Sequence, residues 1–323
     1  MSGDLILGID GGGSKTLLAL ANRQGHILET ALVGGVNPMD NPNWRAELDR
    51  GLAPFRSRAD LAAVAAAFPV FGEVRHLSQA QQEVIAEAFP AARTQVLNDV
   101  DAAHRGAFAG QAGVLILSGT GSMAWARDTE GTSTRSGGWG DVIGDEGSSY
   151  WIGRLALSLV SQSLDGRQPP SRLAPLVLSH LQIDPADAMN GLGAWVTDLA
   201  HPRPAIAALS RLVDQAAREG DMASRRLLDL AADELAKHYR AVAPDANGAD
   251  WTHAGGTFAS GLLLTALEQR IGRPALAPRL PPIGGALLVA AQMLGWSQDQ
   301  DWLTTTAASA RAAVTETMTP LPR

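Results

Sequence analysis

The stretch LILGIDGGGSKT, residues 5–16, constrains this chain more than any other part of its sequence. Its short apolar run predicts a buried strand, and Asp10 ends that strand directly before three consecutive glycines. Because glycine has no Cβ, the backbone of such a loop can approach a phosphate closely and turn its N–H groups toward it. The residues of this predicted phosphate loop are Gly12, Gly13, Ser14, Lys15 and Thr16.

Asp10 has a different role from the glycines that follow it. A carboxylate that faces a phosphate requires a cation between the two groups, and magnesium is suited to this because it keeps most of its hydration shell. We therefore interpret Asp10 as a residue that holds Mg²⁺ through water, and the whole loop as a site for a magnesium nucleotide.

Two familiar phosphate loops are excluded by residue type. A Walker loop requires a lysine where Ser14 stands, and a dinucleotide fingerprint requires a glycine where Thr16 stands. No helix follows the glycines, since residues 16–21 form another apolar run, 22–25 a turn and 26–33 a third strand. The loop is therefore predicted to be the tip of a hairpin.

Composition limits the class of protein. The 323 residues suggest about two domains, and with 46% hydrophobic residues each can bury a core. A net charge of −7 without a Lys/Arg cluster argues against nucleic acid or an anionic membrane as partner. With neither a signal peptide nor a long apolar run, we expect a cytoplasmic protein. The absence of cysteine excludes disulfides, thiolate zinc sites and iron–sulfur clusters.

The second informative stretch is QVLNDVDAA, residues 95–103, where a strand gives way to a helix. A carboxylate at this junction can simply cap the helix. If Asp99 points into a cleft instead, it can accept the proton of a substrate hydroxyl, as the base does in phosphoryl transfer to an alcohol. Asp101 is the alternative candidate for that base.

The third stretch is VLILSGTGS, residues 114–122, which repeats the opening architecture of a buried strand and a glycine turn. A strand at 123–127 and a turn at 128–131 follow it. Two glycine-tipped hairpins about a hundred residues apart imply two similar domains that hold the phosphates from opposite sides. The tip of the second hairpin consists of Gly119, Thr120 and Gly121.

The remaining chain is predicted with less detail. Helices are expected over 44–55, 78–89 with Ser78 as N-cap, 149–164, most of 175–239, and 301–317. The Ala-rich segment 61–70 is expected to be a strand. Residues 249–254 precede a Gly-rich loop and should form a strand, although they are less aliphatic than a central strand requires.

Taken together, the motifs resemble a known family. DGGGSKT, NDVDAA, SGTGS, the run GGWGDVIGDEGSSYWIG, AGGTFASG and PPIGGAL occur in order along most of the chain. They resemble the N-acetylglucosamine kinases and benzoyl-CoA reductase ATPase subunits (the BadF/BadG/BcrA/BcrD ATPase family). That family belongs to the sugar kinase, actin and heat-shock chaperone superfamily.

The resemblance implies an α/β fold of two ribonuclease-H-like, actin-like ATPase domains, with ATP and Mg²⁺ in the cleft between them. The implied domains are residues 1–117, joined by the C-terminal helix at about 300–323, and residues 118–299 with a helical insertion. Asp10 falls on the magnesium-associated aspartate and Asp99 on the catalytic aspartate. Gly12 and Thr16 fall on the first phosphate loop, and the second consists of Gly119, Thr120 and Gly121.

The implied sugar-binding positions are Asn37, Asp99, Trp139, Gly140 and Asp145. The loop beneath the adenosine is implied to include Gly255, Gly256 and Ser260. Trp139 can present an apolar wall to a sugar or an acetyl methyl, although it can equally plug a glycine-rich loop. Asp145 can accept two hydrogen bonds from sugar hydroxyls or cap the helix that follows, and Asn37 can serve an ordinary turn.

The implied activity is ATP-dependent phosphorylation of the 6-hydroxyl of an amino sugar, with N-acetyl-D-glucosamine as the first candidate. Glucosamine, N-acetylmannosamine and N-acetylmuramate remain open as acceptors, as does a homodimer. The expected partners are the sugar and ATP. The electron-activating ATPase subunits of the family need cysteines for a shared cluster, which this chain lacks. A sugar-sensing protein without catalysis is the remote alternative.

Overall fold

The computed structural model describes residues 5–243 and 248–318. Its chain divides into two compact units. The first unit contains the chain up to residue 112 and from residue 277 onward, and the second contains residues 113–276. This division differs from the expected boundary at 117/118, and it places residues 277–299 with the first unit and not with the second.

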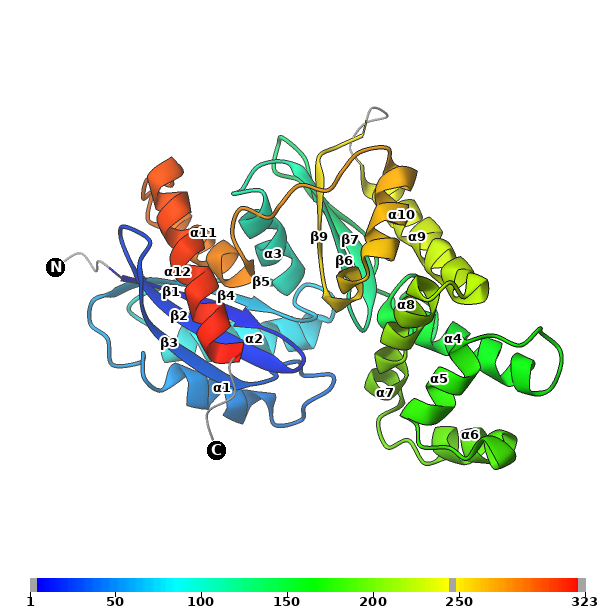
Figure 1. The fold of residues 1–323 in the computed structure, drawn as a ribbon. Helices are drawn as coiled ribbons and strands as arrows, with labels where there is room; N and C mark the ends of the chain where they lie inside the picture. Colours follow the sequence, from blue (N-terminus) through cyan, green and yellow to red (C-terminus); the bar gives the residue numbers. More distant parts are fainter. Residues whose placement is uncertain (1–4, 244–247, 319–323) are drawn as a thin grey trace. The chain divides into compact units, whose positions relative to one another are not determined.

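The first unit is built around a five-stranded sheet in the order β3-β2-β1-β4-β5 (Figure 1). The predicted hairpin is confirmed, because β1 pairs antiparallel with β2 and β2 with β3, whereas β1–β4 and β4–β5 are parallel pairs. Its strands are β1 Leu5–Gly11, β2 Lys15–Asn22, β3 Ile27–Gly34, β4 Leu61–Phe68 and β5 Arg93–Asn98.

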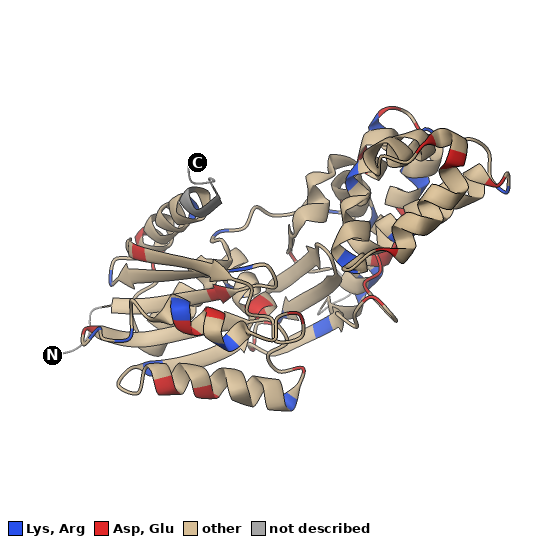
Figure 2. Ribbon diagram, turned by 90° about the horizontal axis from the view of Figure 1, so that it is seen from below, with Lys and Arg blue, Asp and Glu red and all other residues tan. Residues whose placement is uncertain are grey.

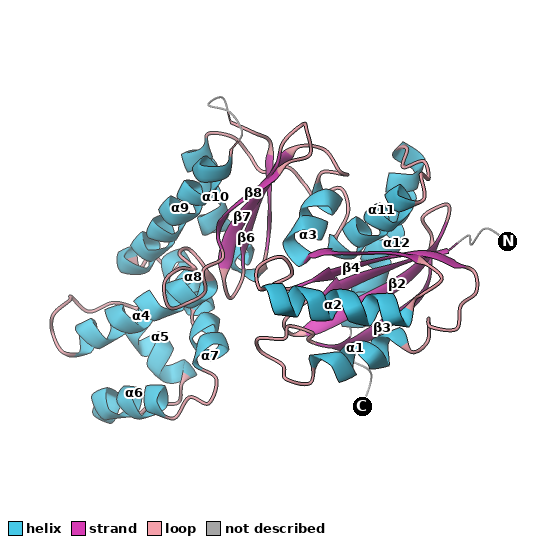
Figure 3. Ribbon diagram, turned by 180° about the vertical axis from the view of Figure 1, so that it is seen from behind, coloured by secondary structure: helices cyan, strands magenta, loops and turns pink. Residues whose placement is uncertain are grey.

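Helices cover both faces of this sheet, since successive strand residues point to opposite sides. Ile6 packs in one core with α11 and α12, and Leu7 packs in another with α1 and α2 (Figure 3). The helix expected at 78–89 begins earlier, so Ser78 is not its N-cap; its hydroxyl donates within the helix to Val74 O. The helices of the unit are α1 Trp44–Leu52, α2 Arg75–Ala88, α3 Asp99–Ala107, α11 Pro282–Met293 and α12 Gln300–Met318.

Close backbone contacts explain Gly285 of the motif PPIGGAL and Gly106 of α3. A Cβ on Gly285 of α11 would lie 1.9 Å from Ala102 O of α3, and one on Gly106 of α3 would lie 3.1 Å from Gly285 Cα. The two helices therefore touch through their backbones. This contact fixes α3, the helix that begins at Asp99, against the core of the first unit.

The second unit has a four-stranded sheet in the order β8-β7-β6-β9. The pairings β6–β7 and β7–β8 are antiparallel and β6–β9 is parallel, which is the pattern of the first four strands of the first unit. The predicted similarity of the two units is thus seen in their topology. The strands are β6 Gly113–Ser118, β7 Ser122–Arg127, β8 Ser133–Gly137 and β9 Trp251–Ala254.

The weakly aliphatic segment before Gly255 does form a strand, and its place in the sheet explains its composition. β9 lies at the edge of the sheet, where a strand is not enclosed by neighbours on both sides. Trp251 is nevertheless buried, and its indole N–H donates to Arg273 O at 3.1 Å.

Helices make up the rest of the second unit, and α9 packs on β6, β7 and β8. The predicted helix at 149–164 is confirmed as α4. The helices are α4 Ser149–Leu164, α5 Leu173–His180, α6 Ala188–Thr197, α7 Pro202–Ala208, α8 Ser210–Arg218, α9 Met222–Val242 and α10 Gly261–Ile271, with short 3₁₀ segments at Pro185–Asp187 and Gly256–Ala259.

Charged residues of both signs are interspersed over the ribbon (Figure 2). Within residues 5–243 and 248–318, no helix is long and apolar enough to cross a membrane.

Candidate active site

The site residues of the first unit gather where its parallel strands end. Asp10 lies near the carboxyl end of β1, and Asp99 directly follows the end of β5. Because β1, β4 and β5 run parallel, their carboxyl ends meet at one edge of the sheet, which is where ligands bind in open α/β sheets. This topology places Asp10 and Asp99 at the same edge of the sheet.

The electrostatics of Asp99 suit a proton acceptor. Burial and then the negative charge of Asp10 raise the pKa of Asp99 to about 7, and Glu73 adds to the effect. The Val100 N–H, which donates to Asp99 Oδ1 at 2.9 Å, acts in the opposite direction. Burial likewise raises the pKa of Asp10 to about 6, partly offset by Lys15. A carboxylate with a pKa near neutrality is matched to general-base catalysis.

Asp101 is engaged elsewhere. Its Oδ2 accepts a hydrogen bond from Arg105 Nε at 3.0 Å, one turn along α3. The helix cap is Asn98, whose side chain accepts from Val100 N and donates to Phe71 O. Capping therefore does not account for Asp101, and Asp99, which shares the Val100 N–H with Asn98, is the better candidate for the base.

The first glycine loop is held by its own backbone and by residues 34–36. Gly12 N donates to Lys15 O, and Val36 N donates to Gly12 O. A Cβ on Gly35 would lie 2.0 Å from Gly13 O, so only glycine fits there. Gly13, Ser14 and Lys15 are exposed at the hairpin tip. Thr16 is not, because it is fully buried and its hydroxyl donates to Gly34 O at 3.0 Å.

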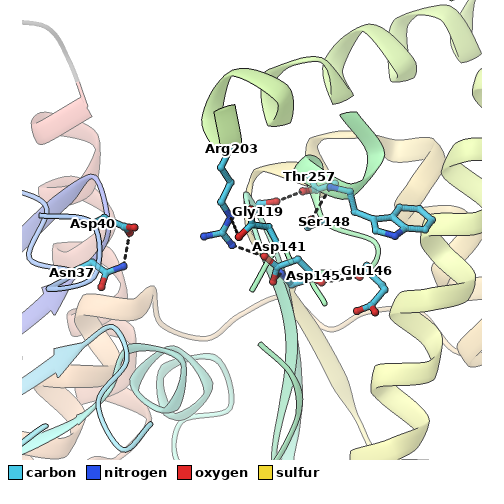
Figure 4. Close-up of polar contacts among 11 residues, drawn as sticks. Asn37, Asp40, Gly119, Asp141, Asp145, Glu146, Ser148, Arg203 and Thr257 are labelled. Carbon is cyan, nitrogen blue, oxygen red and sulfur yellow. Dashed lines mark hydrogen bonds and ion pairs between the residues drawn. The ribbon is translucent and has the colours of Figure 1, made fainter. Parts of the chain in front are cut away.

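Asn37 lies in the loop after β3 with both ends of its amide engaged locally. Its oxygen accepts from Met39 N at 3.1 Å, and its NH₂ donates to Asp40 (Figure 4). The arrangement is that of an ordinary Asx turn. A sugar contact by Asn37 stays a prediction.

The second glycine loop is the tip of the β6–β7 hairpin, as predicted. Gly119 O accepts from Ser149 N at 2.8 Å and from the Thr257 hydroxyl at 3.2 Å, which ties the loop to the start of α4. No atom lies within 4 Å of a Cβ built on Gly119, and Thr120 is exposed. The outer side of this loop is thus open to a ligand.

Asp145 lies beneath this loop and is buried. Its Oδ1 accepts from Ser122 N at 3.2 Å, and its Oδ2 forms an ion pair with Arg203 of α7 (Figure 4). Asp145 has a φ of +60°, a rare backbone conformation for a residue other than glycine and one that is concentrated at functional sites. It does not cap α4, because Ser148 is the N-cap and accepts from Trp151 N.

The Trp139 side chain does not fill the interior of its glycine-rich loop. Its side chain is 65% exposed, and the Arg135 guanidinium lies 5.9 Å from the centre of its ring. Gly140 has a φ of +80° and accepts a hydrogen bond from Gly144 N, so the segment after Trp139 makes a tight turn. An exposed indole beside such a turn is free to form the apolar wall of a sugar site.

The residues predicted to lie beneath the adenosine divide into two kinds. Gly255 and Gly256 are exposed after β9. Ser260 is buried, caps α10 by accepting from Leu263 N, and donates to Asp214. Gly256 and Ser260 line a small cavity of about 90 Å³ together with Arg211 and Asp214 of α8.

His238 of α9 packs against residues 136 and 137, which lead into the loop that carries Trp139. Its Nδ1 lies 3.1 Å from the Ser136 hydroxyl, and a Cβ on Gly137 would lie 2.7 Å from its ring. Burial holds the pKa of His238 below its ordinary value, against an opposing effect of Glu146. In the folded protein the His238 imidazole thus stays neutral at pH values at which the same imidazole is protonated in the unfolded chain.

This predicts a pH-dependent stability difference. The pKa of His238 is lower in the folded than in the unfolded chain, where it is 6.5. The contribution of His238 to the free energy of unfolding is therefore fully present above pH 6.5 and is lost as the pH falls below that value. We expect the difference in Tm between wild type and His238→Gln to shrink between about pH 8 and pH 5.5. The exposed His201→Gln variant is the matched control. A difference that is constant over this range would contradict the prediction.

The carboxylates of the first unit fit a magnesium ion that keeps part of its water shell better than a metal ion coordinated by protein ligands alone. Within the described residues, no group of three or more His, Cys, Asp or Glu side chains could hold a metal ion by itself. The negative charge of Asp10 nevertheless raises the pKa of Asp99, an effect that a bound cation would relieve. Carboxylate oxygens with water and phosphate are the usual ligands of Mg²⁺.

The fold is a mixed α/β fold of the actin-like ATPase class. A family model described as the BadF/BadG/BcrA/BcrD ATPase family matches residues 7–290, so the chain belongs to that family, as the resemblance implied.

Two named relatives are similar in sequence. An N-acetylmuramic acid/N-acetylglucosamine kinase from Clostridium acetobutylicum is 30% identical over 246 residues, which cover 73% of this chain and 78% of the relative. An N-acetyl-D-glucosamine kinase from Dictyostelium discoideum is 36% identical over 124 residues, or 38% of each chain. Among solved structures, a protein assigned as an N-acetylglucosamine kinase from Chromobacterium violaceum is 27% identical with a TM-score of 0.72, covering 89% of this chain and 99% of its own.

Some residues at the site could not have been found from the sequence. Arg203 lies in a region whose apolar spacing predicted only a helical core, and 58 residues separate it from Asp145. Asn98 and Thr257 are ordinary polar residues that donate to backbone oxygens distant in the sequence, at Phe71 and Gly119 respectively.

Proposed function

We propose that this chain is an ATP-dependent kinase that transfers the γ-phosphoryl group of ATP to the primary 6-hydroxyl of an amino sugar, with N-acetyl-D-glucosamine as the preferred acceptor. Phosphoryl transfer to an alcohol is the reaction class of the named relatives. Family membership supports ATP as the phosphoryl donor.

The observation that carries the proposal is the placement of Asp99. It begins α3 at the carboxyl edge of the sheet, keeps part of its surface exposed, and has a pKa raised to about 7. In the proposed step, the sugar oxygen forms a bond to the γ-phosphorus while the bond to the β-bridging oxygen breaks and ADP leaves. Asp99 accepts the proton of the sugar hydroxyl.

The glycine loops supply the other part of the chemistry. Backbone N–H groups at Gly13, Thr120 and Gly121 are proposed to bind the phosphate oxygens, on which negative charge is concentrated. A magnesium ion near Asp10 would, when bound, neutralise part of that charge. Lys15 adds a cation at the exposed hairpin tip.

The acceptor is proposed to bind on the loop from Gly137 to Gly147. Trp139 offers an exposed apolar face to the sugar ring or the acetyl methyl, and the carboxylate of Asp145 accepts hydrogen bonds from ring hydroxyls. N-acetylmuramate is the second candidate acceptor, since the C. acetobutylicum relative is named for both sugars. Glucosamine and N-acetylmannosamine are further acceptors to test.

The test is ADP release from magnesium ATP with a panel of N-acetylglucosamine, N-acetylmuramate, glucosamine, N-acetylmannosamine, glucose and no sugar. We expect turnover with N-acetylglucosamine and little with glucose. Turnover with glucosamine alone would keep the mechanism and overturn the role given to Trp139. Protein that binds ATP but releases no ADP with any sugar would contradict the kinase and favour a sugar sensor.

A further inference from the structure

Arg203 connects the helical part of the second unit to the acceptor loop. It lies in α7, and its guanidinium contacts two carboxylates of the segment GDVIGDEG. Its Nη2 is paired with Asp145 Oδ2, and its Nε lies 3.9 Å from Asp141 Oδ1 (Figure 4). One arginine thus forms a hydrogen-bonded ion pair with Asp145 and lies close to Asp141 without a hydrogen bond to it.

Asp145 needs such a partner. Its side chain is 3% exposed, and a buried carboxylate is costly to ionise unless it is paired and hydrogen-bonded. Ser122 N–H satisfies one carboxylate oxygen and Arg203 the other. Together these two contacts fix the orientation of the carboxylate, while each oxygen retains a lone pair for a further donor.

Arg203 is itself presented from a fixed position. A Cβ on Gly153 of α4 would lie 2.0 Å from Ile206 O, so α7 is pressed against the backbone of α4. The ion-paired side chains also lie close to Gly121, where an added Cβ would be 2.8 Å from Asp145 Oδ1 and 2.9 Å from Arg203 Nη2. The ion pair therefore lies directly against the second glycine loop as well as the acceptor loop.

We propose that Arg203 is a positioning residue for the acceptor sugar. By pairing with Asp145 and fixing its carboxylate in one orientation, it presents the sugar hydroxyls with a preset hydrogen-bond acceptor. This inference rests on the proposed function, in which Asp145 binds the sugar. The rival possibility is that the guanidinium, next to Gly121, binds the phosphates of ATP directly.

The test measures KM for the sugar and KM for ATP separately in Arg203→Ala, Arg203→Lys and the control Arg154→Ala, whose residue is exposed on α4. Loss of a hydrogen bond to a charged group corresponds to about a 10- to 100-fold change, so we expect KM for the sugar to rise by that factor in Arg203→Ala. KM for ATP should stay within about twofold. Lysine keeps the positive charge but lacks the planar guanidinium. We therefore expect KM for the sugar in Arg203→Lys to lie between the values of wild type and Arg203→Ala. The control should match wild type.

A double-mutant cycle with Asp145→Asn covers the case in which Arg203→Ala does not fold. Replacing both residues, as Arg203→Met with Asp145→Asn, leaves no unpaired buried charge. Because Arg203 acts through Asp145, adding Arg203→Met to Asp145→Asn should change KM for the sugar by less than about twofold. Additive effects, or a rise in KM for ATP in place of that for the sugar, would overturn the inference.

The two proposals fail in different ways. Wild-type protein that phosphorylates no sugar would contradict the proposed function, and this inference with it. An active wild type with an unchanged Arg203→Ala variant would overturn the inference alone.

Discussion

Replacing Asp99 with asparagine is expected to reduce turnover by about 100- to 10,000-fold while leaving KM for the sugar within a few-fold. Asparagine has nearly the shape of aspartate and can still hydrogen-bond a sugar hydroxyl, but it cannot accept the proton. The measurement is kcat and KM in the ADP-release assay, supplemented by calorimetric sugar binding where turnover is too slow.

The matched control is Asp101→Asn, two residues further along the same helix. Its carboxylate is paired with Arg105. The variant should lose some stability but keep most of its turnover, since a partly buried i,i+4 pair contributes modestly. If Asp101→Asn abolished turnover and Asp99→Asn did not, the proton acceptor would be Asp101.

A second large effect is expected from Gly255→Ala. Gly255 has a φ of +104° and a ψ of 153°, a region open essentially to glycine alone. A Cβ there would lie 2.1 Å from Ser118 O and 2.9 Å from Gly119 N, which are backbone atoms at the end of β6. Strain and overpacking together should cost about 3 kcal/mol or more, and lower Tm by roughly 6–12 °C.

The displaced backbone leads into the second glycine loop, so KM for ATP should rise in the same variant. Gly256→Ala is the natural control, because no atom lies within 4 Å of its Cβ position. Its stability should stay within about 1 kcal/mol of wild type. Equal Tm values for the two variants would show that the contact with β6 does not limit this turn.

Both glycine hairpins could be predicted because their signals are local. A buried apolar run, a glycine tip and a returning strand lie within about twenty residues, and their pairing needs no distant partner. The strand-to-helix junction at Asp99 was predictable for the same reason. Which residue caps each helix was harder, because Asn98 and Asp99 both stand at the start of α3 and only the geometry separates them.

The unit to which α11 belongs was not predictable from its pattern. Residues 283–291 are buried on every side, so the helix has no polar face that would indicate which sheet it covers. Its Gly285 serves the contact with α3, at Ala102 and Gly106. The strand β9 was ambiguous for a related reason, since an edge position relaxes the demand for aliphatic residues.

Two hydroxyls of the predicted site are engaged inside the protein. Thr16 and Ser260 were assigned to nucleotide binding, yet both are buried with their hydroxyls donating inside the protein. Residue type alone cannot tell a hydroxyl that faces a ligand from one that supports the loop. Arg203 shows the converse, because a charged residue among apolar helical positions gave no sign of its partner.

The most direct test of the account is to identify the product. Wild-type protein would be incubated with magnesium ATP and N-acetylglucosamine, and the phosphorus resonance of the product correlated with the sugar protons by NMR. We predict one phosphate ester, coupled to the two protons on C6, formed in equal amount to ADP. A phosphate on another carbon, or ADP formed without any sugar phosphate, would contradict the proposed reaction.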